Sequence, residues 1–235
     1  MMMDMGRGPN SISFPPPMPL CPGLSGSFMA WDAERLTGPD GDDWRVPVSE
    51  LEERRNRLAS ALAKAGLESA LIDDPVELYW LTGGRQNGMI LVGAEGSGVS
   101  NVHWVRKSLD RARFESGGDD APDSVVAQPR MSGLVDALRA TGATRAPAML
   151  AGKIPHDRWA FFAGRLSSLG DTSDCTHLLY GLRETKSAWE LEMHRESGRI
   201  NRRMFEAIRD VGGVGRTELE MAAAADEVSR TAGFG

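Results

Sequence analysis

Two pairs of residues in this sequence have types and spacings that suit chemistry. Glu190 and His194 are four positions apart, so on a helix they share one face and could hold a cation together. Cys175 and His177 could form a thiol nucleophile with its base. Closeness in sequence does not place a thiol against its base, and a solvated helix pair is the commoner use of a glutamate and a histidine at this spacing. The sequence therefore favours structural roles for both pairs and leaves the thiol–base alternative open.

A glycine-rich stretch is the next candidate for chemistry. Residues 93–98, GAEGSG, could be mistaken for a phosphate-binding loop. Such a loop leads from a strand into a helix, whereas the residues on both sides of this one predict strands. We therefore interpret it as a hairpin loop, and Ser97 lacks the Gly-x-Ser-x-Gly pattern of a hydrolase elbow. The four histidines show no local metal-ligand spacing; they are His103, His156, His177 and His194.

The elements that would position these residues follow from the apolar periodicity. Ser49 and Glu52 are spaced as a capping box, which predicts a helix that ends at Gly66. Asp74 and Pro75 predict the start of a second helix. Strands are expected at residues 69–72, 88–92, 99–105, 124–127 and 148–150, and further helices at residues 108–115, 134–140 and 155–169. Strands that alternate with helices of this length indicate an α/β domain, which we place at residues 46–180.

The pattern changes on either side of that domain. Residues 1–45 are rich in proline and glycine, which predicts a disordered or loosely packed tail. Residues 184–235 contain two amphipathic helical patterns, at 187–211 and after a capping box of Thr217 with Glu220. Two helices without a strand have little to bury their apolar stripe against, so we interpret this segment as the start of an incomplete domain.

Composition excludes several classes of protein. The 235 residues carry 27 lysines and arginines against 33 acidic residues, a net charge of −6, which argues against a nucleic-acid-binding protein. No apolar run approaches the ~20 residues of a membrane span, and the prolines between residues 15 and 19 interrupt any signal-peptide core. The two cysteines, Cys21 and Cys175, suit a reducing compartment. We expect a cytoplasmic protein.

Three short motifs resemble one known family. Residues 74–83, DPVELYWLTG, resemble the Y-L-T-G segment in the N-terminal domain of creatinases, prolidases and aminopeptidases P. Residues 182–193, LRETKSAWELEM, resemble the L-R-x-x-K-S-x-x-E-L junction that opens the catalytic domain of that family. Residues 215–220, GRTELE, are similar to the start of that domain's second helix. The motifs occur in the family's order, over about residues 50–235.

The resemblance implies a creatinase-type N-terminal α/β domain with a mixed, ribonuclease-H-like sheet, followed by an incomplete pita-bread catalytic domain. A full-length relative would be a homodimeric Xaa-Pro metallopeptidase that hydrolyses short proline-containing peptides with two divalent metal ions, manganese, cobalt or zinc. The family's metal ligands lie beyond the matching helices, so we expect no catalytic and no metal-binding residue in this chain. The resemblance makes Tyr79 and Trp80 candidate substrate-binding residues at a neighbouring subunit's active site. A non-catalytic binding or scaffold module of the same family is the alternative.

Overall fold

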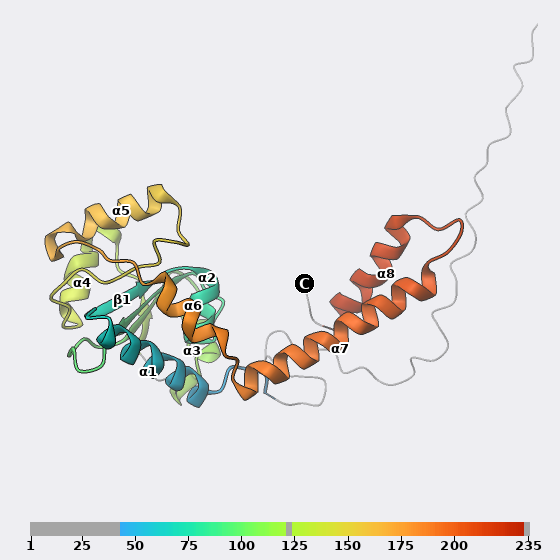
Figure 1. Cartoon of the computed structure of the whole chain (residues 1–235), viewed down its shortest axis with the longest axis horizontal. Helices are drawn as coiled ribbons and strands as arrows, with labels where there is room; N and C mark the ends of the chain where they lie inside the picture. The colour runs from blue at the N-terminus through green and yellow to red at the C-terminus, as the bar shows by residue number, and fades with distance from the viewer. Residues whose placement is uncertain (1–42, 121–123, 233–235) are drawn as a thin grey trace, which may run out of the picture.

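The computed structural model describes residues 43–120 and 124–232, so most of the predicted tail lies outside the described residues. The chain forms a sheet domain from which a helical hairpin projects (Figure 1). The strands are β1 (Ser69–Ile72), β2 (Gly88–Gly93), β3 (Val102–Val105) and β4 (Ser124–Ala127). The α-helices are α1 (Val48–Lys64), α2 (Pro75–Thr82), α3 (Leu109–Glu115), α4 (Leu134–Ala140), α5 (His156–Leu166), α6 (Thr176–Glu184), α7 (Ala188–Val211) and α8 (Glu218–Thr231).

The sheet is mixed and has the order β1-β2-β3-β4. β1, β2 and β3 form an antiparallel meander, and β4 pairs with β3 in parallel. On the outer edge of β1, an isolated parallel bridge joins Ala70 to Ala148, and a second isolated parallel bridge joins Met149 to Asp174 beyond it. The sheet contains both antiparallel and parallel pairs, so the predicted α/β class with a mixed sheet is confirmed.

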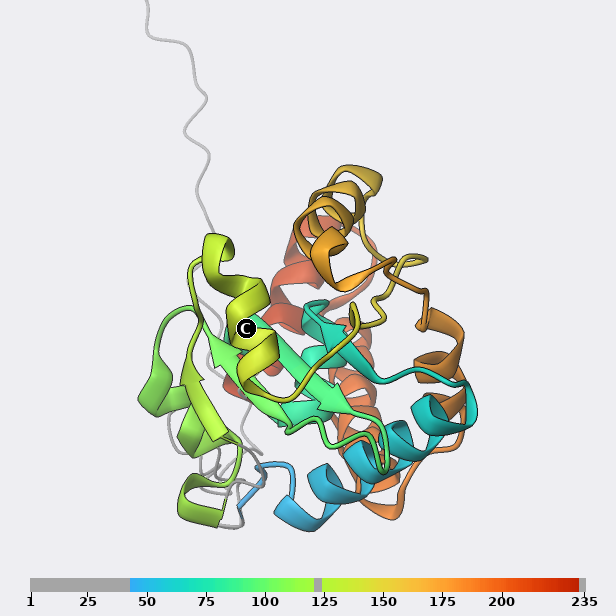
Figure 2. The ribbon, with the colours of Figure 1, turned by 90° about the vertical axis from the view of Figure 1, so that its left-hand side faces the viewer.

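Helices cover both faces of the sheet (Figure 2). On one face, leucines of α1, α2 and α6 pack on Ile72 and Ile90. On the other face, α4 and α5 pack on Leu71 and Leu91. Neighbouring residues of a strand point to opposite faces, so the continuous apolar runs at 70–72 and 89–92 are what a sheet buried on both sides requires.

Local capping signals position the helices. Oδ1 of Asp74 accepts hydrogen bonds from the backbone N–H groups of Val76 and Glu77, as the sequence predicts. α2 ends at Gly83, whose φ of 68° is left-handed. A Cβ there would lie 3.0 Å from the Glu115 carbonyl oxygen, so the turn after α2 requires glycine. The predicted capping box at Thr217 is also present.

Four predictions of local structure differ from what the structure shows. The strand expected at residues 148–150 is reduced to isolated bridges at Ala148 and Met149. α1 begins at Val48 with Pro47 as its N-cap, so Ser49 lies inside the first turn and makes no capping hydrogen bond. β3 begins at Val102 rather than at residue 99, because the backbone N–H of Ser100 donates to Thr141 outside the sheet. Helix α6 was missed, and it runs past residue 180, where the sequence suggested that the sheet domain ends.

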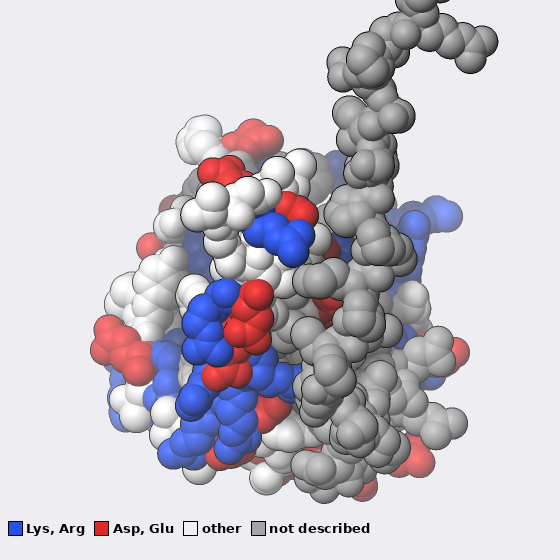
Figure 3. Space-filling view, turned by 90° about the vertical axis from the view of Figure 1, so that its right-hand side faces the viewer, with Lys and Arg blue, Asp and Glu red and all other residues white. Residues whose placement is uncertain are grey.

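The C-terminal hairpin consists of α7 and α8, which pack on each other and project from the sheet domain (Figure 1). Only Ile200 on α7 and Ala225 on α8 are buried, whereas Phe205 and Leu219 are 72% and 81% exposed. Acidic and basic side chains alternate over this end of the molecule and form i,i+3 and i,i+4 pairs along α7 (Figure 3). Within the described residues, no helix is long and apolar enough to cross a membrane.

Candidate functional site

The two candidate substrate-binding residues lie next to each other on α2 but in different environments. Tyr79 is 39% exposed, and burial of the rest of its ring raises the pKa of its hydroxyl. Trp80 is 5% exposed, and its Nε1 donates a hydrogen bond of 2.9 Å to Oε1 of Glu190. Trp80 therefore connects the sheet domain to the first turn of α7, across 110 positions of sequence.

Arg54 completes this connection from α1. It is 2% exposed, and its Nη1 donates 2.9 Å to the backbone oxygen of Trp80. Its Nη2 lies 2.9 Å from a Glu50 oxygen and 3.1 Å from Oε1 of Glu190. The guanidinium also lies over the rings of Trp80 and Trp189, 5.3 and 5.6 Å from their centroids. Burial lowers the pKa of Arg54, although both glutamates oppose that effect.

Glu190 has a second role at the same place. Its Oε2 accepts from the backbone N–H of Ser187, while the Ser187 hydroxyl accepts from the Glu190 N–H, a capping box that starts α7. Burial alone would raise the pKa of Glu190, but the Ser187 N–H, Arg54 and Trp80 together hold that pKa below its usual range. The Glu190 carboxylate therefore fixes the direction in which α7 leaves the sheet domain.

A second buried carboxylate ties α2 to α6. Glu77 is fully buried, and its Oε1 accepts from Lys153 Nζ at 2.7 Å and from Arg183 Nη1 at 2.6 Å. Lys153 also bonds Asp74 at 2.9 Å. Glu77 and Trp80 belong to the motif at residues 74–83, and Arg183 and Glu190 belong to the motif at residues 182–193. These two motifs therefore contact each other through the Glu77–Arg183 and Trp80–Glu190 pairs.

Glu190 and His194 belong to no metal centre within the described residues. Glu190 is engaged by Arg54, Trp80 and Ser187, as described. Within residues 43–120 and 124–232, no three His, Cys, Asp or Glu side chains lie close enough together to hold a metal ion. The described residues therefore do not fit the two-metal centre that the resemblance implies.

Cys175 is a core residue. Its side chain is fully buried, its Sγ–H donates to the Met149 carbonyl oxygen at 3.5 Å, and burial, assisted by the charge of Asp174, raises the pKa of its thiol to about 12. A thiol needs to ionise to act as a nucleophile, so this environment suits a structural cysteine.

We expect Cys175 to resist thiol reagents in the folded chain. In a Cys21→Ala background, Ellman's reagent should label Cys175 only as fast as the domain unfolds, because the thiolate is scarce and access is closed. The measurement is the absorbance of released thionitrobenzoate, with the same variant in guanidinium chloride as the control for complete labelling. Rapid stoichiometric labelling in native buffer would contradict the assignment.

A cleft lies elsewhere in the described part of the chain, at one end of the sheet. It has a volume of about 850 Å³ and is lined by the segments that follow β1, β3 and β4 and by the segment that precedes β2. Asp73, Arg85, Arg106 and Gln128 come from these four segments. Sequence reasoning did not identify this cleft, because no motif joins the four segments; only the pairing register of the strands brings them together.

The fold and these contacts can be compared with known proteins. A family model described as the creatinase/prolidase N-terminal domain matches residues 54–185. A search among curated proteins gives no match. Among solved structures, dipeptidase PepE from Mycobacterium ulcerans superposes with a TM-score of 0.62 at 23% identity, over 78% of this chain and 50% of that chain.

Two further solved structures have a similar fold. The Xaa-Pro dipeptidase from Bacillus anthracis gives a TM-score of 0.63 at 16% identity, over 77% of this chain and 49% of that one. The X-Pro aminopeptidase from Thermotoga maritima gives 0.59 at 16% identity, over 76% and 49%. The shared feature is the fold, and this chain spans about half the length of the proteins that it matches.

Proposed function

Since this chain belongs to the creatinase/prolidase N-terminal domain family, we propose that it is the front half of an Xaa-Pro peptidase. In this proposal the whole protein hydrolyses short peptides at proline in a metal-dependent reaction, and this chain alone does not. The observation that carries the proposal is the extent of the structural likeness, which takes in 78% of this chain but only 50% of dipeptidase PepE. The exposed apolar side chains of α7 and α8, Phe205 and Leu219 among them, suit a surface on which further structure packs.

In this proposal the residues of this chain orient the helices that lead into the catalytic half and do not carry out the reaction. The contacts of Glu190 with Arg54 and Trp80 set the direction of α7, and Glu77 fixes α6 against α2. In the family reaction, metal ions activate the attacking water. We propose that Tyr79 contributes an exposed ring at the edge of a neighbouring subunit's substrate site, and that Trp80 acts there only through the position it gives α2 and α7. A homodimer in the cytoplasm is part of the same proposal.

The test is an assay of proline release from the dipeptide Ala-Pro with added Mn²⁺. A polypeptide that continues this chain through the rest of the fold is expected to release proline and to leave Ala-Ala uncleaved. The purified 235-residue chain is expected to release none above the buffer level. The Xaa-Pro dipeptidase from Bacillus anthracis is the positive control. Proline release by the purified chain would overturn the assignment to a front half, and an inactive longer polypeptide would overturn the peptidase assignment.

A second candidate function is a non-catalytic binding module of the same family. The specific observation that favours it is the cleft at the end of the sheet, whose volume of about 850 Å³ lies within the range of ligand-binding pockets. Binding in this cleft requires nothing from the catalytic half of the fold. A ligand that binds the purified chain would therefore support this function even if proline release is absent.

A further inference from the structure

One side of α7 faces away from α8 and carries apolar residues at a regular spacing. Ile200 is buried in α7, and α8 is the helix that packs on α7. A helix turns by about 100° per residue, so Gly198 lies on the opposite side of α7 from Ile200. Leu191 and Phe205 are each seven positions from Gly198, close to two helical turns, and therefore share its side of the helix. They are 43% and 72% exposed.

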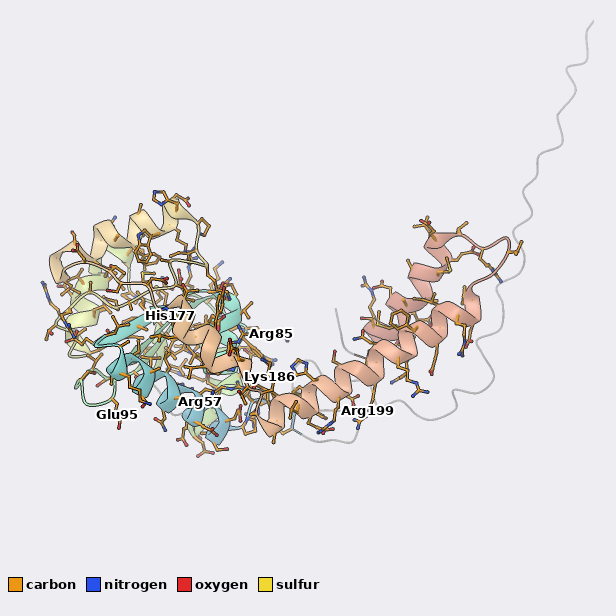
Figure 4. The ribbon with its side chains drawn as sticks, in the orientation of Figure 1. Arg57, Arg85, Glu95, His177, Lys186 and Arg199 are labelled. Atoms are coloured by element: carbon orange, nitrogen blue, oxygen red, sulfur yellow. The ribbon has the colours of Figure 1, made fainter. Side chains whose placement is uncertain are left out.

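This side of α7 has both a hollow and a projecting ring. The hollow has a volume of about 470 Å³ and is lined by Gly198, Asn201, Arg202, Phe205, Glu206 and Arg209. Gly198 keeps it open, because a Cβ added there would meet no atom of the described residues within 4 Å beyond the backbone of its own helix. The ring of Phe205 projects seven residues further along. Figure 4 shows Arg199 on the same helix, in the part of the hairpin that projects from the sheet domain.

The charged side chains along α7 balance one another. The arginines on or beside this side of the helix each have an acidic neighbour on α7, in the pairs Arg195–Glu192 at 3.0 Å, Arg199–Glu196 at 2.7 Å, Arg202–Glu206 at 3.0 Å and Arg209–Asp210 at 3.4 Å. The surface therefore carries no net charge, which does not suit a nucleic acid or an anionic membrane. An apolar centre with a rim of both charges suits a protein surface that is itself mixed in charge.

We propose that this side of α7 binds a second copy of the chain, with the two α7 helices antiparallel and Phe205 of each copy in the hollow over Gly198 of the other. A knob and a hole on one surface are complementary to the same surface turned about a twofold axis midway between them, which is the geometry of an isologous dimer. The axis passes between Asn201 and Arg202. The contact has the knobs-into-holes form by which helices pack in coiled coils.

The same axis brings opposite charges together. It places Glu206 opposite Ser197 of the second copy, so the carboxylate lies between Arg195 and Arg199 of that copy. These charged side chains leave α7 on the same side of the Gly198–Phe205 line, within about 40° of one another around the helix. Arg202 comes close to its own counterpart at the axis, where each is already paired with Glu206 of its own copy at 3.0 Å.

The ends of the hairpin are complementary in the same arrangement. Val214 is fully exposed in the turn between α7 and α8, and Leu191 is exposed near the base of α7. Antiparallel pairing brings the tip of each hairpin to the base of the other, so Val214 approaches Leu191 of the second copy. The pairing therefore covers exposed apolar side chains at three places along one helix. It concerns the 235-residue chain by itself and goes beyond the peptidase proposal, so either can fail alone.

The first experiment is sedimentation equilibrium of the 235-residue chain from micromolar to near-millimolar concentration. We expect the apparent mass to rise from 25.4 kDa toward twice that value and no further, because a twofold pairing is closed. Phe205→Ala removes the knob and Gly198→Leu fills the hole, and each should raise the dimer dissociation constant at least about tenfold.

The variants keep the fold measurable. Leucine is a better helix former than glycine, so Gly198→Leu should leave α7 intact, and circular dichroism during urea unfolding checks both variants. Leu219→Ala is the matched control, at a leucine of α8 that is 81% exposed and lies outside the proposed contact. It should dimerise as the parent does.

The second experiment tests the axis by disulfide formation in a Cys21→Ala background, in which Cys175 is buried. Asn201→Cys lies beside the axis and should give a disulfide-linked dimer on mild oxidation. Arg195→Cys is the control on the same helix. Antiparallel pairing holds it about 20 Å from its own counterpart, too far for a disulfide.

Three results would overturn the proposal. One is a chain that stays monomeric at every concentration. Another is a dimer that Phe205→Ala and Gly198→Leu weaken no more than Leu219→Ala does. The third is cross-linking of Arg195→Cys as fast as Asn201→Cys, which would indicate a parallel or unspecific association of the helices.

Discussion

Replacing Arg54 by methionine is expected to destabilise the sheet domain by about 3 kcal/mol, the scale on which breaking a buried ion pair from one side acts. Arg54→Met keeps much of the apolar stem but removes the guanidinium that bonds Glu50, Glu190 and the Trp80 carbonyl oxygen. Those acceptors would remain in a site from which water is largely excluded. Urea unfolding followed by circular dichroism measures the loss.

The same variant should loosen the start of α7. Glu190 would lose a cation that favours its charged form. Among the described residues, Trp80 would then be the remaining side chain of the sheet domain that bonds the Glu190 carboxylate. Amide hydrogen exchange of the first turn of α7 should accelerate. Arg139→Met, at an exposed arginine 3.8 Å from Asp136 on α4, is the control and should change stability by less than about 0.5 kcal/mol. Equal losses in the two variants would mean that Arg54 does not organise the junction.

His103 should make the chain lose stability as the solution becomes mildly acidic. Its ring is 1% exposed on β3, and neither ring nitrogen has a hydrogen-bond partner within the described residues. Burial, assisted by the positive charge of Arg55, lowers the pKa of His103 from 6.5 to about 4. The unfolded chain therefore binds a proton between these values that the folded chain does not, and stability falls as the pH falls through this window.

The expected size of this effect is about 2 kcal/mol between pH 7 and pH 5, from the linkage of one proton to unfolding. His103→Leu should abolish most of that dependence without a loss of stability at pH 7, because it also removes two unsatisfied buried nitrogens. Urea unfolding at the two pH values measures it. His156→Gln, at an exposed histidine of α5, should keep the parent's pH dependence. A His103→Leu variant as acid-sensitive as the parent would show that other groups cause the effect.

Signals that act within a few residues were read correctly from the sequence. Asp74 caps α2, Gly83 ends it, and Thr217 starts α8, because each depends on hydrogen bonds or backbone angles inside one turn. The same reasoning failed at Ser49, where a proline one position before the helix took the cap role. Spacing alone did not reveal which of two starting positions, two residues apart, the helix would use.

Local sequence signals could not predict the contacts between segments that lie far apart in the sequence. The hydrogen bond of Trp80 to Glu190 spans 110 positions of sequence. The sequence indicated only that each residue belongs to a motif that resembles the same family. The sequence did not predict α6 because Gly181 interrupts its helical pattern. In the structure Leu179 is buried against the sheet, and this packing is what makes the segment helical.

The cleft was missed for a related reason. Arg85 and Arg106 are unremarkable as isolated surface arginines, and nothing local distinguishes them from Arg202 on α7. Only the pairing of Gly88 with Val105 places the two at one end of the sheet. The substrate-binding role of Tyr79 and Trp80 stays a prediction, and the structure adds that the two side chains differ in exposure and in partners.

Our central proposal is that this chain supplies the positioning half of a peptidase and that the two-metal centre of the whole protein lies outside it. The most direct measurement is a titration of the purified 235-residue chain with Mn²⁺, followed by the electron paramagnetic resonance signal of the free aqueous ion. The account predicts that the free-ion signal rises in proportion to added Mn²⁺, as it does in buffer alone. Loss of that signal up to two Mn²⁺ ions per chain would contradict the account, because the chain would then hold the metal centre that we place outside it.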